Sequence, residues 1–254
     1  MNLKTLEVLF TPADFNELKQ RNLAGTACVV FDVFRATSSM INALGNGAEA
    51  VIPVGEIAEA VALRARNPAV LLAGERDGVR IQAAQSGGVD FDFGNSPREF
   101  TPARVRGRTI VSTTTNGTRA LRSCAHAASV WAASFLNLAA TAETVRQNAS
   151  ESLIIICSGT FEETALEDVL GAGALCDLLW NDAATARVSD AALMALKLFR
   201  AGQGNLLAAA SEARNGRKLL SNPDLRDDVA FSMQRDIWNF AAQLLQDGRI
   251  VRVK

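Results

Sequence analysis

The sequence predicts an α/β fold built on a largely parallel sheet. Segments with apolar residues at helical spacing alternate with short apolar runs, the first of which are ACVVFDV, AEAVIPV and AVLLAGE. The chain of 254 residues is long enough to bury a substantial core. A β-α-β-α-β order places neighbouring strands in parallel with crossover helices covering the sheet, which is the basis of the prediction.

The first third of the chain contains the clearest elements. In order, they are strand 27–33, helix 35–47, strand 48–54, helix 55–68, which ends at Asn67-Pro68, and strand 69–75. A long irregular stretch over 74–107 follows, rich in Gly, Asp, Ser and Pro. Phe91, Phe93 and Phe100 are expected to anchor it to the core, so we interpret it as a functional segment rather than an interdomain linker.

The alternation then returns. The predicted elements are strand 108–114, helix 116–126, strand 128–134, helix 136–148, strand 152–159 and a nearly all-apolar, hence buried, helix over 165–180. The segments 28–75 and 108–160 could record an internal duplication into two similar βαβαβ halves, although any α/β fold repeats itself in this way. A long helix over 225–245 and a strand over 248–253 complete one domain covering residues 1–254.

Composition and charge argue against several classes of protein. The net charge is −1, and the 26 basic and 27 acidic residues are scattered, so neither nucleic acid nor a membrane surface is an expected partner. The N-terminus lacks the pattern of a signal peptide, and no apolar run approaches the roughly 18 residues of a membrane span. We therefore expect a cytoplasmic protein, with its four cysteines as reduced, buried thiols.

Three predicted strand-to-helix turns are rich in hydroxyl groups. They are Asp32–Ser39, Thr113–Thr118 and Ser158–Thr160. In a parallel sheet these turns lie at the carboxyl ends of the strands, where α/β proteins bind ligands. Free backbone N–H groups at helix starts attract anions, so the turns predict an anionic ligand, most simply a phosphate.

The second of these turns, STTTNGT, carries five hydroxyls in seven positions. It is not a P-loop because it lacks Gly-Lys-[Ser/Thr]. Its alternative interpretation is a strand end of β-forming residues followed by an Asn-Gly turn and a helix cap. The density of hydroxyls favours a turn that grips phosphate.

The first turn joins Asp32 to Arg35. An acid in this place can simply cap the next helix, or it can do metal or proton chemistry beside a cation that binds a negative charge. Haloacid-dehalogenase phosphatases need a second aspartate two residues later, where this chain has Phe34, so that mechanism is rejected. The only histidine, His126, lies at the far end of a helix from the turns, which argues against Ser-His-Asp and Cys-His chemistry.

Further carboxylates are expected near the same edge. Glu75 ends the third predicted strand, and Glu167 and Asp168 begin the buried helix. Acids in a first helical turn are favoured electrostatically in any case. Beside a phosphate site, however, such carboxylates would also hold Mg²⁺, which prefers oxygen ligands and water.

Taken together and in this order, FDVFRATSSMINALGNGAEAVIPV, LLAGERDG, FDFGNSP, VSTTTNGTRAL and ALEDVLGAGAL resemble the 2-phosphosulfolactate phosphatase family. The resemblance covers residues 28–180. It implies a Mg²⁺-dependent phosphatase with a three-layer α/β/α fold and a largely parallel or mixed sheet. The named reaction releases phosphate from (2R)-2-phospho-3-sulfolactate, giving (2R)-3-sulfolactate on the route to coenzyme M.

The residues and the resemblance together give a candidate site. Asp32 and Arg35 are the predicted catalytic residues, and the metal ligands are expected among Asp32, Glu75, Glu167 and Asp168. The candidate substrate-binding residues are Thr37, Ser38, Asn95, Ser96, Thr114, Thr115, Asn116, Gly117 and Thr118.

The expected partner is a small anionic phosphoester. The segment VRIQAAQSGGVD is longer and more irregular than the family pattern, which leaves the substrate open. The alternatives are a phosphatase acting on another phosphorylated hydroxy acid and a non-catalytic protein that binds an anionic metabolite. The oligomeric state is also left open, with a homodimer among the options.

Overall fold

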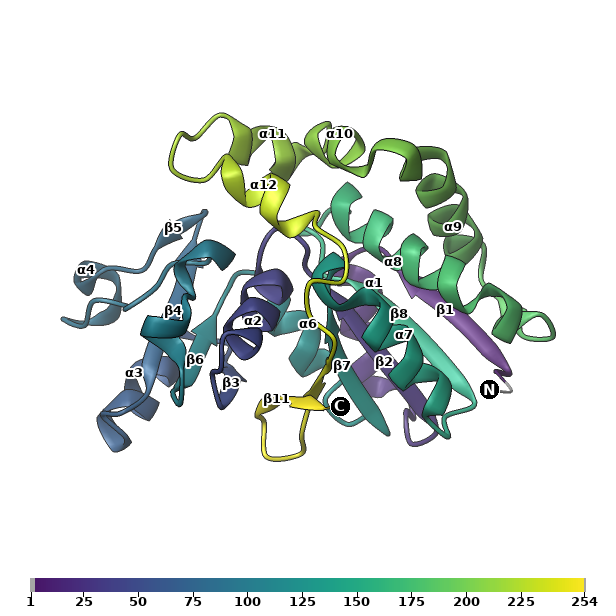
Figure 1. Ribbon diagram of the computed structural model, residues 1–254. Helices are drawn as coiled ribbons and strands as arrows, with labels where there is room; N and C mark the ends of the chain where they lie inside the picture. The colour runs from purple at the N-terminus through teal and green to yellow at the C-terminus, as the bar shows by residue number, and fades with distance from the viewer. Residues whose placement is uncertain (1–2, 254) are drawn as a thin grey trace.

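A mixed sheet of eleven strands runs through the protein, whose computed structural model describes residues 3–253 (Figure 1). The strands lie in the order β5-β4-β6-β3-β11-β10-β7-β2-β8-β1-β9. Their bounds are β1 Thr5–Leu9, β2 Thr26–Phe31, β3 Ala50–Pro53, β4 Leu71–Arg76, β5 Val79–Arg80, β6 Thr109–Thr113, β7 Ser129–Ala133, β8 Ser152–Cys157, β9 Arg187–Val188, β10 Ala241–Leu244 and β11 Ile250–Val253. The predicted α/β class is confirmed.

Helices cover both faces of this sheet, giving the three-layer arrangement (Figure 1). Their bounds are α1 Pro12–Asn16, α2 Ala36–Gly45, α3 Ile57–Arg66, α4 Ala83–Ser86, α5 Pro102–Val105, α6 Gly117–Ser123, α7 Leu138–Gln147, α8 Leu166–Leu179, α9 Asp190–Gly202, α10 Leu206–Ser211, α11 Arg214–Leu220 and α12 Asp227–Ser232. No helix within residues 3–253 is long and apolar enough to cross a bilayer.

The pleat of β2 shows why the layers form. Val29 and Phe31 face an apolar cluster shared with α7, α8 and α9. Cys28 and Val30 point to the other face, where they meet side chains of α1, α2 and α6. Successive residues of a strand face opposite sides of a sheet, so a continuous apolar run is buried on both faces.

The two predicted halves interleave in the sheet. Strand β2 pairs in parallel with β7 and β8, whereas β6 pairs in parallel with β3 and β4. The first strand of each half thus lies between the second and third strands of the other. The antiparallel hairpin β10–β11 joins the two groups by pairing with β7 and β3. An internal duplication stays a prediction.

The prediction of a long helix over 225–245 is wrong. Only α12 is helical there, and β10 follows it as a strand. Asp236 has a φ of 55°, a left-handed conformation that interrupts a helix. Ala242 pairs with Ala132 of β7, and burial between two strands overrides the helical spacing of the apolar residues.

The long stretch over 74–107 is more ordered than expected, since it contains β5, α4 and α5. Phe91, Phe93 and Phe100 are buried as predicted, and the rings of Phe93 and Phe100 stack with centroids 4.7 Å apart. All four cysteines are buried free thiols, also as predicted. The stretch therefore forms a folded flank of the sheet.

Candidate active site

A pocket is lined by residues that follow β2, β4, β6 and β8 and by residues of α11. Figure 1 shows α11 above this edge of the sheet. The predicted convergence of these turns is therefore observed. The sequence-predicted residues that line the pocket are Asp32, Arg35, Glu75, Asn95, Thr114, Thr115 and Asn116. His126 lies outside it.

Asp32 follows the last residue of β2 and is almost fully buried. Its Oδ1 accepts a hydrogen bond from the N–H of Ala36 at 3.0 Å. Burial raises the pKa of Asp32 to about 6, the charge of Glu75 adds to the rise, and the hydrogen bonds and Arg35 oppose it. A Cβ on Gly117 would lie 2.5 Å from Asp32 Oδ2, so only glycine lets the two turns meet this closely.

The hydroxyls that follow Asp32 build the turn from behind the pocket. Thr37 Oγ1 donates to the carbonyl oxygen of Asp32 at 2.9 Å, and Ser38 Oγ donates to that of Val33 at 2.9 Å. Ser39 Oγ reaches across to the carbonyl oxygen of Asn95 at 2.6 Å. These side chains are buried and fix the backbone that carries Asp32.

Arg35 is held from two sides, by Asp228 and by Gly78. Its Nη1 lies 2.9 Å from Asp228 Oδ2, and its Nη2 donates to the carbonyl oxygen of Gly78 at 3.2 Å. Ser96, which lies behind the pocket, donates from its hydroxyl to Asp228 Oδ1 at 2.6 Å. Asn95, the neighbour of Ser96, lines the pocket itself.

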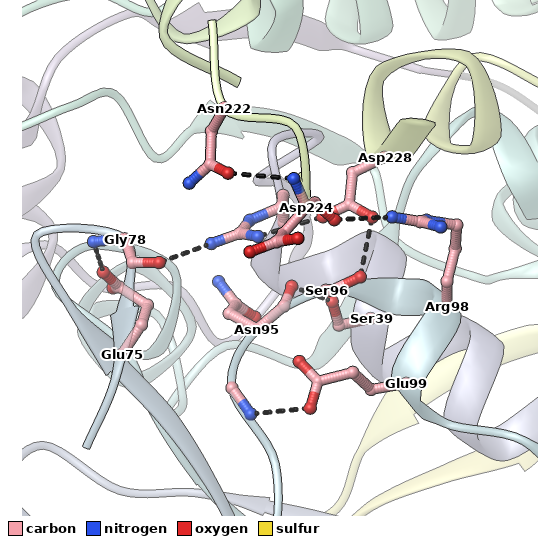
Figure 2. Close-up of polar contacts among 12 residues, drawn as sticks. Ser39, Glu75, Gly78, Asn95, Ser96, Arg98, Glu99, Asn222, Asp224 and Asp228 are labelled. Carbon is pink, nitrogen blue, oxygen red and sulfur yellow. Dashed lines mark hydrogen bonds and ion pairs between the residues drawn. The ribbon is translucent and has the colours of Figure 1, made fainter. Parts of the chain in front are cut away.

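Glu75 ties the threonine-rich turn to the end of β4. Its Oε1 accepts from both the N–H and the hydroxyl of Thr115 at 3.1 Å. Its Oε2 accepts from the N–H of Gly78 at 2.7 Å, which also sets the loop that meets Arg35 (Figure 2). Both oxygens of this carboxylate therefore already have donors.

The rest of the turn holds itself together. Thr118, behind the pocket, donates its N–H to Thr114 Oγ1 at 3.2 Å and its hydroxyl to the carbonyl oxygen of Thr114 at 3.1 Å. The Asn116 amide donates to the carbonyl oxygens of Ser158 and Phe161 at 3.2 and 3.0 Å. The predicted third turn is thus fastened to the second.

Glu167 and Asp168 begin α8 and lie beneath the pocket lining. Asp168 Oδ1 accepts from the N–H of Val33 at 2.8 Å, and Oδ2 accepts from the hydroxyl of Ser158 and the N–H of Gly159, both at 3.1 Å. Burial, together with the charges of Asp32 and Glu167, raises the pKa of Asp168 well above its usual range. Asp168 therefore anchors the strand-end loops to the helix.

Glu167 differs from its neighbour. Its Oε1 accepts from Asn215 Nδ2 at 2.5 Å, but Oε2 is buried without a hydrogen-bond partner among residues 3–253. Burial raises the pKa of Glu167 to about 7, and the charge of Asp32 also raises it. An unpartnered carboxylate oxygen beside another acid is where a cation would be stabilised.

The donor set fits Mg²⁺ better than a metal in a closed protein cage. Among residues 3–253 no group of three His, Cys, Asp or Glu side chains is placed to hold a metal ion. Mg²⁺ sites typically use one or two carboxylates and keep several waters. Asp32 and Glu167 are the carboxylates that would hold such an ion, because Glu75 and Asp168 have their oxygens occupied by N–H and O–H donors.

Several pocket residues escaped the sequence interpretation. Arg214, Asn215 and Lys218 of α11 line the pocket, and Asp228 of α12 holds Arg35 behind it. The available signal was the basic segment RNGRK over 214–218, in a chain whose cations are otherwise scattered. No local pattern marks Asp228, because its partner lies 193 positions away in the sequence.

The fold and the pocket define an α/β protein with cationic and hydroxyl side chains lining a pocket beside buried carboxylates. The family model for 2-phosphosulpholactate phosphatase matches residues 12–247. A Symbiobacterium thermophilum protein named probable 2-phosphosulfolactate phosphatase is 38% identical over 84% of this chain and 88% of its own length. A Pseudothermotoga lettingae protein of the same name is 35% identical over 95% of this chain and 96% of its own length. The chain therefore belongs to the 2-phosphosulpholactate phosphatase family, and so is a phosphoric monoester hydrolase.

Proposed function

We propose that this enzyme hydrolyses (2R)-2-phospho-3-sulfolactate to (2R)-3-sulfolactate and phosphate with Mg²⁺ as cofactor. Two cations flanking Gly78 support a substrate with two anionic groups. A Cβ on Gly78 would lie 4.0 Å from Arg35 Nη2 and 3.9 Å from Lys218 Nζ. Neighbouring cations of this kind raise the local concentration of a dianion.

In this proposal Arg35 binds the phosphoryl oxygens. Its planar guanidinium carries five N–H donors and suits a tetrahedral oxyanion, while Lys218 at the pocket rim offers a compact charge to the second anionic group. Within the Thr114–Thr118 turn, Thr114 lines the pocket, and its hydroxyl adds a donor that does not need to reorganise during the reaction. With the two cations, this hydroxyl binds and orients the ester. The N–H and hydroxyl groups of Thr115 and Thr118 hold the turn in place through Glu75 and Thr114.

Asp32 and Glu167 would hold the metal ion. Mg²⁺ bound there supplies neutralisation of the phosphoryl charge and a polarised water or ester oxygen. Asp32 is positioned for this by the Ala36 N–H on Oδ1 and by the close approach of the Gly117 backbone on the side of Oδ2. Its placement is equally compatible with attack of Asp32 on phosphorus and with a water nucleophile.

The test is a phosphate-release assay with Mg²⁺ on Asp32→Asn and Arg35→Ala. Each variant is expected to lose at least about 100-fold in kcat/KM, since each removes a charge facing the transferred group. Asp247→Asn, an acid paired with Arg249 in the exposed β10–β11 turn, is the matched control. Full activity in both site variants would refute the assignment.

A second substrate class is favoured by one observation. Lys218 is exposed, and its Nζ donates only to the carbonyl oxygen of Asp77, at 3.2 Å, among the described contacts. A flexible ammonium does not distinguish a sulfonate from a carboxylate. A panel that compares phosphosulfolactate with phosphoglycolate and related phosphorylated hydroxy acids separates the two. Thermal stabilisation by phosphate without turnover of any panel member would instead indicate a binding protein.

A further inference from the structure

A fully buried carboxylate lies directly behind the arginine of the site. Asp228 is 0% exposed and accepts from Arg35 Nη1 at 2.9 Å, Ser96 Oγ at 2.6 Å and Arg98 Nε at 2.8 Å (Figure 2). It does not line the pocket. We propose that Asp228 is a positioning residue, which fixes the guanidinium of Arg35 against the phosphoryl group. This inference rests on the proposed function.

Two contacts fix the plane of the guanidinium. Asp228 holds Nη1, and the carbonyl oxygen of Gly78 holds Nη2 at 3.2 Å. A planar fork held at both terminal nitrogens cannot rotate about its long side chain. The remaining N–H groups are left for an anion in the pocket that Arg35 lines.

The oxygens of Asp228 are used in different ways. Oδ2 accepts a hydrogen bond from Arg35, whereas Oδ1 accepts hydrogen bonds from Ser96 and Arg98. Since both oxygens are occupied by strong donors and are shielded from solvent, Asp228 is neither a base nor a metal ligand. Its action on the substrate therefore passes through Arg35.

The charge balance of this cluster shows how a buried arginine is accommodated. Two guanidinium groups, from Arg35 and Arg98, share this one buried carboxylate. Arg98 Nη1 also lies 3.6 Å from Asp227 Oδ2, so Asp228 is the carboxylate that offsets the cost of burying Arg35, which is only 4% exposed. A neutral residue at 228 would leave Arg35 without its counter-ion and without its anchor.

The further contacts of Arg98 place the same constraint on the C-terminal segment. Arg98 Nη2 donates to the carbonyl oxygen of Asp224 at 2.8 Å, and Asn222 Oδ1 accepts from the N–H of Asp224 at 3.0 Å (Figure 2). Asn222 also lines the pocket. The start of α12 is thereby fixed relative to the site, so the carboxylate of Asp228 has a defined place from which to orient Arg35.

The first experiment is chemical rescue with free guanidinium ion. In Arg35→Ala, Asp228 keeps Ser96 and Arg98 as partners, so the vacated space retains a carboxylate that can seat guanidinium. We expect guanidinium to restore phosphate release in this variant at least about 10-fold, because the charge-assisted pair re-forms. In the double variant Arg35→Ala/Asp228→Asn we expect guanidinium to raise phosphate release less than about 2-fold. Equal rescue of the two variants, or rescue of neither, would overturn the proposal.

Both variants of the rescue experiment lack Arg35, so neither leaves this buried arginine unpaired. The comparison between them therefore does not require that the single variant Asp228→Asn folds. If Asp228→Asn folds, we expect this substitution in the wild-type background to lower kcat/KM on the order of 100-fold. That is the effect of misplacing a reacting contact by about 1 Å. In the Arg35→Ala background the same change is expected to cost less than about 3-fold. A similar loss in both backgrounds would show a merely structural role.

Asp227→Asn on the same helix is the matched control, because the Asp227 side chain is 68% exposed and its described contact with the cluster is a long ion pair, 3.6 Å from Arg98 Nη1. It should keep wild-type kinetics. Calorimetric titration with inorganic phosphate separates failure of this inference from failure of the proposed function. If wild type binds phosphate but hydrolyses no phosphoester, the proposed function fails. Weaker phosphate binding by Asp228→Asn than by Asp227→Asn would still support the positioning role, and equal binding would overturn it.

Discussion

Glu167→Gln should stabilise the metal-free protein at neutral and alkaline pH. Glu167 is 1% exposed, its Oε2 has no hydrogen-bond partner among residues 3–253, and the charge of Asp32 adds to its electrostatic cost. Glutamine has the same shape and keeps an oxygen that can accept from Asn215. The substitution therefore removes a buried charge with little change in packing.

The sign follows from the pKa of Glu167, which burial raises from 4.5 to about 7. Between these values the folded protein binds more protons than the unfolded chain, so stability falls as pH rises through this window and stays lower above it. A shift of this size corresponds to about 3 kcal/mol. For a chain of this length that is a difference of roughly 6–12 °C in Tm.

The assay is thermal unfolding in EDTA from pH 4 to pH 8. The Tm of Glu167→Gln relative to wild type should rise between pH 4.5 and pH 7 and level off above it. Glu143→Gln, whose carboxylate is 58% exposed, should show no such trend. Added Mg²⁺ should stabilise wild type more than Glu167→Gln at pH 8. A Tm difference that is independent of pH would refute the reasoning.

Three further predictions test the turns and the pocket rim. Gly117→Ala should lower kcat at least about 10-fold by displacing Asp32, whereas Gly25→Ala, with nothing within 4 Å of its new Cβ, should not; equal kinetics would contradict this. Lys218→Met should raise KM for a doubly anionic ester about 10-fold with little change in kcat, and an unchanged KM would count against a role in binding. Gly45→Ala places a Cβ against the indole ring of Trp238, so urea unfolding should show a loss of about 1–3 kcal/mol in the free energy of unfolding, with KM unchanged; wild-type stability would contradict the packing argument.

The local patterns of the sequence predicted the strands from β2 to β4 and from β6 to β8, the strand β11, and the helices α2, α3 and α6 to α8, but not β1, β9, β10 or α9. The run ACVVFDV became β2, buried on both faces, because its residues are apolar at every position of the pleat. The pattern could not predict that β10 would separate β7 from β11, since AAQL carries no strong strand preference of its own. Its strand form depends on pairing with neighbours that are distant in sequence.

The candidate site was predicted in part for a similar reason. Turns at strand ends can be recognised by their hydroxyl residues and glycines, so Asp32 and Thr115 could be expected to meet at one edge of the sheet. The sequence did not separate residues that face the pocket from residues that support them. Ser96 and Thr37 are buried donors to Asp228 and to the backbone of Asp32, and a motif alone gives both roles the same signature.

The C-terminal third changes how the site is understood. Motifs before residue 180 supply the turns. Asn215 and Lys218 of α11 and Asp228 of α12 contact residues of that part of the chain. Asn215 donates to Glu167, and Asp228 pairs with Arg35, so the proposed metal ligand and the proposed phosphate ligand are each held by a residue from this segment. Such contacts join charges far apart in sequence, and only the closed fold brings them within hydrogen-bonding distance. The proposed anion site is therefore completed by the segment that carries the weakest sequence signal.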